Sequence, residues 1–221
     1  MGAGLHVATG AVAQSLLAER LNQGAGQLGL ALTAQQQQRL LQFLALLARW
    51  NQVYNLTAVR DPLEMVARHL LDSFSIQPFL FGDRLLDIGT GAGLPGLPLA
   101  ILEPERRFFL LDSNGKKIRF VRQAVRELGL LNVEPIQARI ERYRPGQKFS
   151  TIVSRAVTDT EILPVLEAGL LARPGRLLLM KGRHPDDALD SRAWPTLTTT
   201  VHCLHVPFLD VSRHLIEIRS V

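Results

Sequence analysis

From Arg84 onward, the sequence alternates short apolar runs with amphipathic stretches, and this pattern restricts the possible folds more than any other feature. Short apolar runs between polar residues are typical of strands buried on both faces, as in parallel sheets. The amphipathic stretches between them are typical of crossover helices. We therefore predict a doubly wound α/β sheet. Its predicted strands are residues 85–88, 108–111, 133–137, 151–153 and 177–180, followed by an antiparallel hairpin of 201–208 and 214–219.

Two helices are predicted before the sheet. Residues 33–54 place apolar side chains at helical spacing, and Thr33 with Gln36 has the spacing of a capping box at their start. Asp61 is suited to cap a second helix that begins with a proline and covers residues 62–71.

The residues before Thr33 carry several glycines and little clear periodicity, so a short helix and then a loose connection are expected there. Residues 1–80 are thus predicted to form an N-terminal helical cap, and residues 81–221 the sheet domain. At 221 residues the chain is long enough to bury a substantial core in one compact unit.

A glycine-rich turn follows the first predicted strand and leads into a helix. Residues 87–96 read Asp-Ile-Gly-Thr-Gly-Ala-Gly-Leu-Pro-Gly. Glycines let backbone N–H groups approach a ligand closely, and a helix start adds partial positive charge, so a nucleotide-like ligand is expected here. The spacing also matches the dinucleotide fingerprint, so the glycines alone fit either S-adenosylmethionine or a nicotinamide cofactor.

Two acidic residues narrow the choice of cofactor. Asp87, two residues before the first glycine, is suited to face the cationic amino-acid end of S-adenosylmethionine, whereas it would repel a pyrophosphate. Asp112, at the end of the second predicted strand, is expected to accept hydrogen bonds from ribose hydroxyls in either cofactor class. The same fold logic places Thr90, Gly91 and Ser113 against the cofactor.

Positive charge is concentrated in one segment. The chain has a formal net charge of +5, and residues 106–148 carry eleven Lys or Arg against four Asp or Glu. Arg119, Arg122 and Arg126 form a stripe on one predicted helix and are candidate contacts for RNA phosphates. A solvated helix face is the alternative explanation of such a stripe.

The cysteine content and the absence of a long apolar run bear on location and chemistry. A single cysteine, Cys203, forms no internal disulfide and no cysteine metal cluster, so a cytoplasmic protein without a metal, a membrane anchor or a secretory signal is expected. Cys203 falls in a late strand, where a small buried side chain is expected, so covalent catalysis on a pyrimidine is unsupported. The sequence also offers no obvious catalytic base. Methylation of guanine at N7 would need none, because N7 presents an exposed lone pair and its methylation requires only alignment with the methyl group.

These residues resemble the bacterial family of small-subunit ribosomal RNA guanine-N7 methyltransferase G, also called glucose-inhibited division protein B. The resemblance covers nearly the whole chain from about Leu21. Its most specific marks are Gly-Leu-Pro-Gly-Leu-Pro at 93–98 and Ser-Arg-Ala at 154–156. The other matching residues are 50–51, 54–57, 68–69, 72–73, 87–92, 110–113, 116–117 and 181–182.

The resemblance implies a fold, a reaction and a set of site residues. The fold would be a Rossmann-like class I S-adenosylmethionine-dependent methyltransferase sheet with an N-terminal helical cap. The reaction would be methyl transfer to N7 of one guanine in the 530 loop of 16S rRNA, on naked RNA or on the small subunit, by a monomer. The family's cofactor positions fall on Gly89, Leu94, Ile140, Glu141 and Arg155.

The resemblance also suggests roles near the substrate. Arg155 is the best candidate to face both cofactor and target base, and Lys181 is a candidate contact for RNA phosphate. His69 and Asp72 are expected to pack the cap against the sheet domain, and Trp50 to lie in a helix seam. An NAD-dependent oxidoreductase and a non-catalytic RNA-binding protein on the same fold stay open as alternatives.

Overall fold

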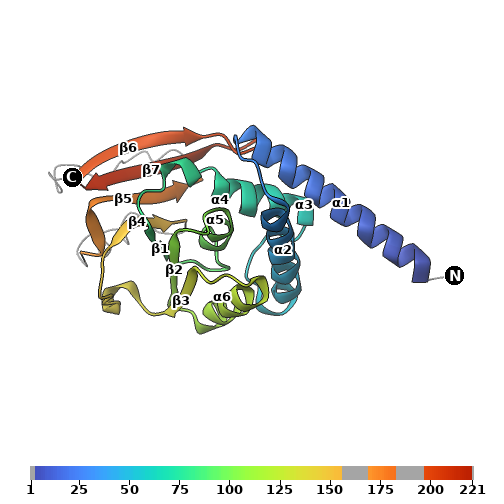
Figure 1. The fold of residues 1–221 in the computed structure, drawn as a ribbon, viewed down its shortest axis with the longest axis horizontal. Helices are drawn as coiled ribbons and strands as arrows, with labels where there is room; N and C mark the ends of the chain where they lie inside the picture. Colours follow the sequence, from blue (N-terminus) through green and yellow to red (C-terminus); the bar gives the residue numbers. More distant parts are fainter. Residues whose placement is uncertain (1–2, 156–168, 183–196, 221) are drawn as a thin grey trace.

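The computed structural model describes residues 3–155, 169–182 and 197–220, and its centre is a sheet with the strand order β3-β2-β1-β4-β5-β7-β6 (Figure 1). Strands β1 to β5 pair in parallel, and β7 runs antiparallel between β5 and β6. The predicted parallel sheet and its final hairpin are confirmed. The strands are β1 (Arg84–Ile88), β2 (Arg107–Asp112), β3 (Val133–Gln137), β4 (Phe149–Ser154), β5 (Leu171–Lys181), β6 (Leu197–Leu204) and β7 (Arg213–Ser220).

Two late strands differ from the sequence prediction. β5 begins at Leu171 rather than at residue 177, and β6 begins at Leu197 rather than at residue 201. β6 takes in a run of β-branched threonines, which favours extended backbone and pairs with β7. Because β6 is an edge strand, Cys203 is exposed there, so the expectation that it is buried was wrong.

The described α-helices pack on one face of the sheet (Figure 1), whereas Ile140, in a 3-10 helix after β3, packs on the other face. Alternate strand residues, among them Phe108, Leu110 and Leu178, join the helices in one buried cluster, while their neighbours Phe109, Leu111 and Leu177 form a second cluster on the other face. The helical elements are α1 (Ala3–Gln27), α2 (Ala34–Tyr54), α3 (Pro62–Met65), η1 (Val66–Leu71), α4 (Asp72–Phe74), η2 (Gln77–Phe79), α5 (Gly96–Leu102), α6 (Gly115–Leu128) and η3 (Ile140–Arg142).

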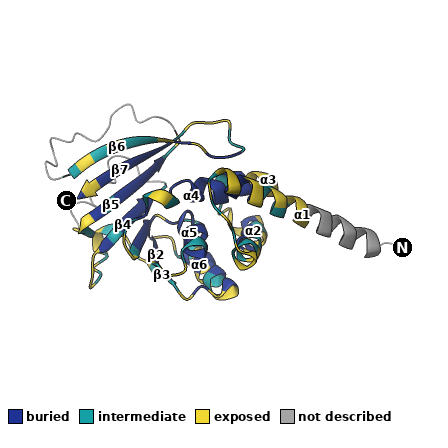
Figure 2. Cartoon of the chain, turned by 45° about the horizontal axis from the view of Figure 1, so that its top comes forward, coloured by how far each residue is buried: buried dark blue, intermediate teal, exposed yellow. Residues whose placement is uncertain are grey.

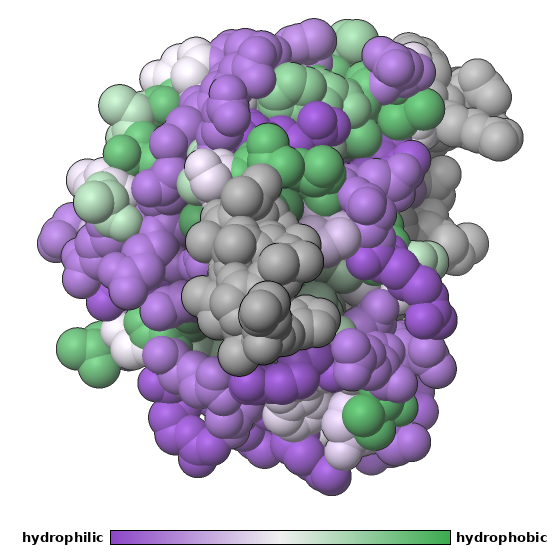
Figure 3. Space-filling model, turned by 90° about the vertical axis from the view of Figure 1, so that its right-hand side faces the viewer, coloured by the Kyte–Doolittle hydropathy of each residue, from purple (hydrophilic) through white to green (hydrophobic). Residues whose placement is uncertain are grey.

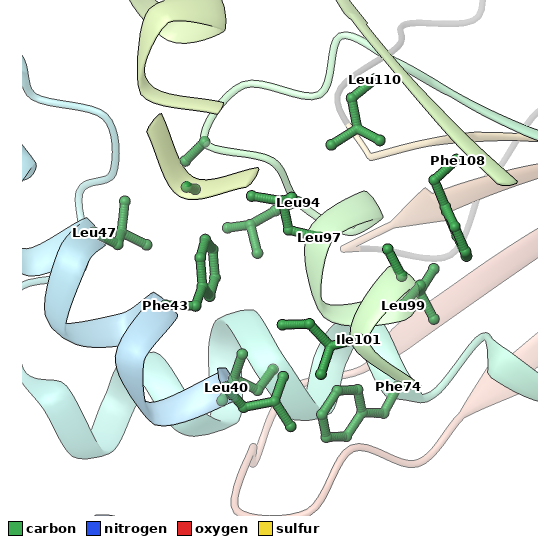
Figure 4. Packing of buried hydrophobic residues seen from close by; sticks show 14 of the residues in the cluster. Leu40, Phe43, Leu47, Phe74, Leu94, Leu97, Leu99, Ile101, Phe108 and Leu110 are labelled. Carbon is green, nitrogen blue, oxygen red and sulfur yellow. The ribbon is translucent and has the colours of Figure 1, made fainter. Parts of the chain in front are cut away.

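The cap and the sheet share a single core. Leu40 and Phe43 of α2 pack beside Leu97 of α5, and Phe74 of α4 lies below them (Figure 4). Trp50 of α2 also meets the ring of Phe120 in α6 edge-on at 5.6 Å, which confirms the predicted helix seam. The cap therefore has a fixed position on the face of the sheet.

The two predicted helices of the cap begin where expected, but the one that begins at Pro62 continues as a π-helix. Thr33 and Gln36 make both bonds of the capping box, and Asp61 accepts a hydrogen bond from Glu64 N. After Met65 the chain forms the π-helix η1, with one extra residue per turn, and then α4. Such π segments are often found at functional sites. Here the π-helix ends directly before Asp72.

The N-terminal segment is a helix of 25 residues, so the prediction of a short helix was wrong. Gly24, one of the glycines on which the predicted loose connection was based, is a packing position: a Cβ there would lie 2.3 Å from a methyl carbon of Leu71. Gly29, with φ +75°, instead follows the helix end, where a left-handed residue is common. The helix projects beyond the sheet and is largely exposed where its side chains are described (Figure 2).

Candidate functional site

The candidate site lies at the carboxyl ends of β1 and β4, where the strand order reverses. Ligands of open α/β sheets bind in the crevice at this position. The hydroxyl of Ser154 donates a hydrogen bond of 2.8 Å to the carbonyl of Ile88 and ties the two strand ends together. Arg155 follows directly, so it lies beside the turn that begins at Asp87. Ala156, the last residue of the Ser-Arg-Ala motif, is outside the described residues.

Asp87 is a buried carboxylate with one oxygen in use and one without a partner. Its Oδ2 accepts hydrogen bonds from Thr90 Oγ1 at 2.6 Å and from Gly96 N at 2.9 Å. Its Oδ1 is buried and has no hydrogen-bond partner among the described residues. Burial raises the pKa of Asp87 to about 7. A cationic ligand group at Oδ1 would therefore stabilise the ionised form.

The glycine turn is not built as a phosphate cradle. The N–H groups of Gly89 and Thr90 both donate to Leu111 O, at 2.8 and 3.1 Å, and Gly91 N donates to Asp112 Oδ2 at 3.0 Å. A pyrophosphate site needs such N–H groups directed at the ligand. Their use within the protein, next to two carboxylates, disfavours the nicotinamide alternative.

Space for a ligand exists at the first glycine of the turn. Gly89 has φ +67°, and a Cβ there would meet no protein atom within 4 Å. Gly96 has a different role, since a Cβ there would lie 2.7 Å from Asp87 Oδ2 and would break the contact between the helix start and the carboxylate. Gly89 thus faces open space, whereas Gly96 keeps Asp87 in position.

Asp112 is held at the adjacent strand end. It is 6% exposed, and its Oδ1 accepts a hydrogen bond from Asn114 N at 2.8 Å. Lys117 Nζ lies 3.6 Å from Oδ2. Each carboxylate oxygen has a second lone pair, so Asp112 can still accept from hydroxyl groups. Ser113, next to it, is exposed at the same edge.

The residues after β3 reach the same edge of the sheet. Ala138 N donates to Asp112 O at 3.3 Å, and the 3-10 helix η3, with Ile140 and Glu141, follows. Ile140 packs on the second core cluster, and Glu141 is exposed. Leu94 is different, because its side chain is 7% exposed and lies in the core shared with the cap (Figure 4). Only its backbone is placed to contribute to the turn.

A pocket of about 200 Å³ opens beside Arg155. This volume is below the roughly 300–1,000 Å³ of sites for drug-sized ligands. Its walls combine apolar side chains, cations and one carboxylate, and its lining residues are Asp72, Arg155, Met180, Lys181, Gly182, Leu204, Arg213 and His214. The pocket is therefore smaller than a site that encloses a whole nucleoside cofactor.

An ion-pair cluster forms one wall of this pocket. Asp72 Oδ1 accepts a hydrogen bond of 2.9 Å from Arg213 Nε, and Asp72 Oδ2 lies 3.7 Å from Arg155 Nη1. Sequence reasoning gave Asp72 a packing role and did not identify Arg213. No local pattern marks Arg213, because it enters the site from β7, far along the chain.

His69 is buried near this cluster but does not pair with Asp72. Its Nε2 lies 2.9 Å from Thr57 Oγ1. Burial, with the positive charge of Arg155 as a second cause, lowers the pKa of His69 to about 4. His69 is therefore neutral at pH 7 and links two segments of the cap.

This lowered pKa predicts an acid-dependent loss of stability. The unfolded chain binds a proton at His69 near pH 6.5, whereas the folded protein binds it only near pH 4, so acid favours unfolding across this interval. The expected loss from this group is about 2 kcal/mol at pH 5 relative to pH 7.5. Urea unfolding of the wild type and of His69→Gln at both pH values measures it. Equal pH dependence in the two proteins would contradict the assignment.

The predicted RNA-binding residues occupy two places. Arg119, Arg122 and Arg126 are all exposed on α6, which starts at the site edge and runs away from it. At 1.5 Å per residue, Arg119 lies about 6 Å and Arg126 about 16 Å along the helix from Gly115. Lys181 ends β5 and lines the pocket. The structure does not bring the stripe and Lys181 together in one cluster.

The described residues hold neither a metal-binding cluster nor a membrane-spanning helix. No group of three or more His, Cys, Asp or Glu within 3–155, 169–182 and 197–220 is arranged to hold a metal ion. No helix in the same part of the chain is long and apolar enough to span a membrane. On the side where the N-terminus lies, the surface is mostly hydrophilic, with hydrophobic residues in separate small areas (Figure 3).

Comparison with known families identifies the chain. Its residues 36–216 match the family model described as rRNA small subunit methyltransferase G. The chain belongs to the rRNA small subunit methyltransferase G family. A methyltransferase G of Marinobacter nauticus is 53% identical over 197 residues, which cover 89% of this chain and 92% of the relative. One of Methylococcus capsulatus is 50% identical over 199 residues, 90% and 97% of the two chains. The predicted family is confirmed.

Solved structures with the same fold are also methyltransferases. A magnesium protoporphyrin IX methyltransferase of Synechocystis covers 79% of this chain and 94% of its own, with a TM-score of 0.57 and 14% identity. An S-adenosylmethionine-dependent methyltransferase of Aquifex aeolicus covers 73% and 94%, with a TM-score of 0.52 and 17% identity. At these identities they establish the fold alone, and the predicted class I methyltransferase fold is confirmed.

In this member of the methyltransferase G family, the predicted cofactor residues meet at the carboxyl ends of the parallel strands. Asp87 lies near the end of β1, Gly89 and Gly91 follow this strand, Asp112 ends β2, and Arg155 follows β4. Residues from separate segments thus meet where the fold binds its ligands. Their individual roles stay predictions.

Proposed function

We propose that this methyltransferase G family member transfers the methyl group of S-adenosylmethionine to N7 of one guanine in the 530 loop of 16S rRNA. The observation that supports this best is the buried Asp87, whose Oδ1 has no partner among the described residues, next to a turn in which the N–H groups of Gly89, Thr90 and Gly91 are already bonded. Such a site favours a cationic amino-acid group over a phosphate. The family relationship supports the small-subunit RNA substrate.

The residues present fit this cofactor. Asp87 would hold the α-ammonium group, Asp112 the ribose hydroxyls, and Ile140 with Glu141 the adenine. Gly89 leaves the space in front of the turn free of side chains. When bound, S-adenosylmethionine supplies an electrophilic methyl group on a sulfonium.

The pocket beside Arg155 would hold the target base. Met180 and Leu204 offer apolar contact to its ring, and Arg155 separates this pocket from the turn at Asp87. The arginines and the lysine in its walls donate hydrogen bonds and do not accept protons, and Asp72 is paired with Arg213. This suits attack by N7, because its lone pair is exposed and no proton has to leave. The protein's contribution is then alignment and electrostatics.

The exposed stripe on α6 would contact RNA phosphates outside the pocket. The triple variant Arg119→Gln, Arg122→Gln and Arg126→Gln is expected to weaken RNA binding and to lower its salt dependence by up to about 2–3 units of log Kd per log salt. Filter binding at several salt concentrations measures both. A matched control removes three exposed cations near the amino-terminal ends of the strands, away from the site: Arg107, Lys148 and Arg173. If both triple variants bind alike, the stripe is a solvated face.

We also propose that the protein acts in the cytoplasm as a monomer. Its substrate is then naked 16S rRNA or the small ribosomal subunit, and parallel assays with both distinguish these forms. Light scattering of the purified protein at micromolar concentration measures its molar mass and so tests whether it is a monomer.

The proposed reaction is tested on RNA that lacks the modification. Small subunits and naked 16S rRNA from a strain without this protein are incubated with the pure protein and methyl-labelled S-adenosylmethionine. Label in one guanine of the 530 loop, with the product identified as N7-methylguanosine, is the expected result. Label at another base or atom would overturn the proposed target, and no label in either RNA would favour a binding protein without catalysis.

A further inference from the structure

We infer that Asp72, contributed by the helical cap, is a positioning residue that holds the guanidinium of Arg155 at the boundary between cofactor and target base. The inference rests on the proposed function. It begins from the burial of Asp72, whose side chain is 4% exposed, and from the contact of each carboxylate oxygen with a different arginine. The three residues come from α4, β7 and the end of β4.

The two contacts of Asp72 are unequal. Arg213 donates to Oδ1 at 2.9 Å, a normal charge-assisted hydrogen bond. Arg155 Nη1 lies 3.7 Å from Oδ2, beyond hydrogen-bond distance, and this buried atom has no hydrogen-bond partner among the described residues. Arg213 thus satisfies the carboxylate, while Arg155 is attracted by its charge and keeps a donor available for a ligand.

The local backbone fixes Asp72 in this position. The π-helix η1 ends directly before it, and Ser75 Oγ donates to Asp72 O at 2.7 Å. Ser73 Oγ donates to His69 O at 2.5 Å on the preceding turn. These side-chain bonds hold the short turn that presents the carboxylate, so the position of Asp72 is defined by the cap and not by the arginines alone.

Removal of the carboxylate would change where Arg155 lies. Arg155 and Arg213 would then face each other without a counter-charge, and two like charges in a partly buried pocket repel strongly. The side chain of Arg155 is 31% exposed and has solvent available to it. We expect it to turn outward, away from Asp87 and the pocket.

The charge of Asp72 also suits the reaction. As the bond from N7 to the methyl carbon forms, the carbon–sulfur bond breaks and its electron pair stays on sulfur. Positive charge moves from the sulfonium to the purine, and no proton is released. Asp72 offsets the charge of the arginine that it holds, so Arg155 can lie beside the purine without opposing this positive charge in full.

The test is a double-mutant cycle in kcat between Asp72→Asn and Arg155→Gln, with 16S rRNA as substrate. If Asp72 acts through Arg155, we expect Asp72→Asn to lower kcat at least tenfold with less than a threefold change in the Kd of S-adenosylmethionine. The double variant should then be no slower than Arg155→Gln alone. Multiplied losses in the double variant, or a fully active Asp72→Asn, would overturn the inference.

Further variants separate a loss of activity from a loss of folding stability. Asp72→Asn leaves two partly buried cations without their counter-charge, whereas Asp72→Asn with Arg213→Gln removes one negative and one positive charge. A purely structural role predicts that this balanced pair recovers both melting temperature and kcat; a positioning role predicts that only the melting temperature recovers. Glu64→Gln, which removes an exposed carboxylate of the same cap, should be fully active. An inactive wild type would instead overturn the proposed function, and this inference with it.

Discussion

Replacement of Asp87 by asparagine is expected to lower the affinity for S-adenosylmethionine by about 10- to 100-fold, the size of one charge-assisted hydrogen bond of roughly 1.5–3 kcal/mol. The amide keeps an oxygen for Thr90 Oγ1 and Gly96 N, so the turn should stay intact. Only the charge opposite the ammonium group is lost. Titration calorimetry with S-adenosylmethionine measures the change.

The same substitution should not destabilise the cofactor-free protein. Burial raises the pKa of Asp87 to about 7, so the ionised carboxylate opposes folding at pH 8, whereas asparagine has no charge to bury. The melting temperature without cofactor is therefore expected to be equal or higher. A protein that melts lower and still binds the cofactor normally would show that Asp87 is a structural cap and not a ligand-binding group.

The raised pKa also predicts how wild-type affinity depends on pH. Below pH 7 the carboxyl group takes up a proton, and affinity should fall by up to about tenfold for each further pH unit. Above pH 7 the affinity should be constant over the range in which the ligand stays cationic. Asp87→Asn should lose this dependence. Gly89→Asp, which fills the open space at φ +67° with a second acid, should abolish binding and give an independent check.

Replacement of Arg155 by glutamine is expected to lower kcat by about 100-fold, the usual cost of losing one preorganised electrostatic group or about 1 Å of alignment. Arg155 lies between Asp87 and the pocket, where cofactor and base would meet. The Kd of S-adenosylmethionine should rise less than tenfold, because Asp87 and Asp112 remain. Single-turnover methylation of 16S rRNA separates the two effects.

The control for Arg155 is an arginine far from the site. Arg107→Gln removes an exposed cation at the amino-terminal end of β2, whereas the site lies at the carboxyl ends of the strands, so this variant should leave kcat unchanged. If the loss in Arg155→Gln were entirely in cofactor affinity, with normal kcat at saturation, Arg155 would be a cofactor ligand without a role at the target base.

The sheet was predictable because its signals are local. Central parallel strands are buried on both faces, so β1, β2 and β4 stand out as apolar runs, and the periodicity of α6 marks its buried face. The start of β6 was missed, since edge strands lack such a run. The long helix α1 was missed because Gly24 is a packing position against Leu71, which no nearby residue reveals.

The sequence by itself determined the family, the α/β sheet and the position of the glycine-rich turn, because each depends on residues close together in the chain. Only the tertiary structure decided how the pocket is built. It brings Asp72, Arg155 and Arg213 into one ion-pair cluster, although they are widely separated in sequence. It also shows that the first three N–H groups of the glycine turn, those of residues 89–91, are already bonded. Charge pairing and hydrogen-bond satisfaction depend on distances between segments, and those distances exist only after the cap has packed on the sheet.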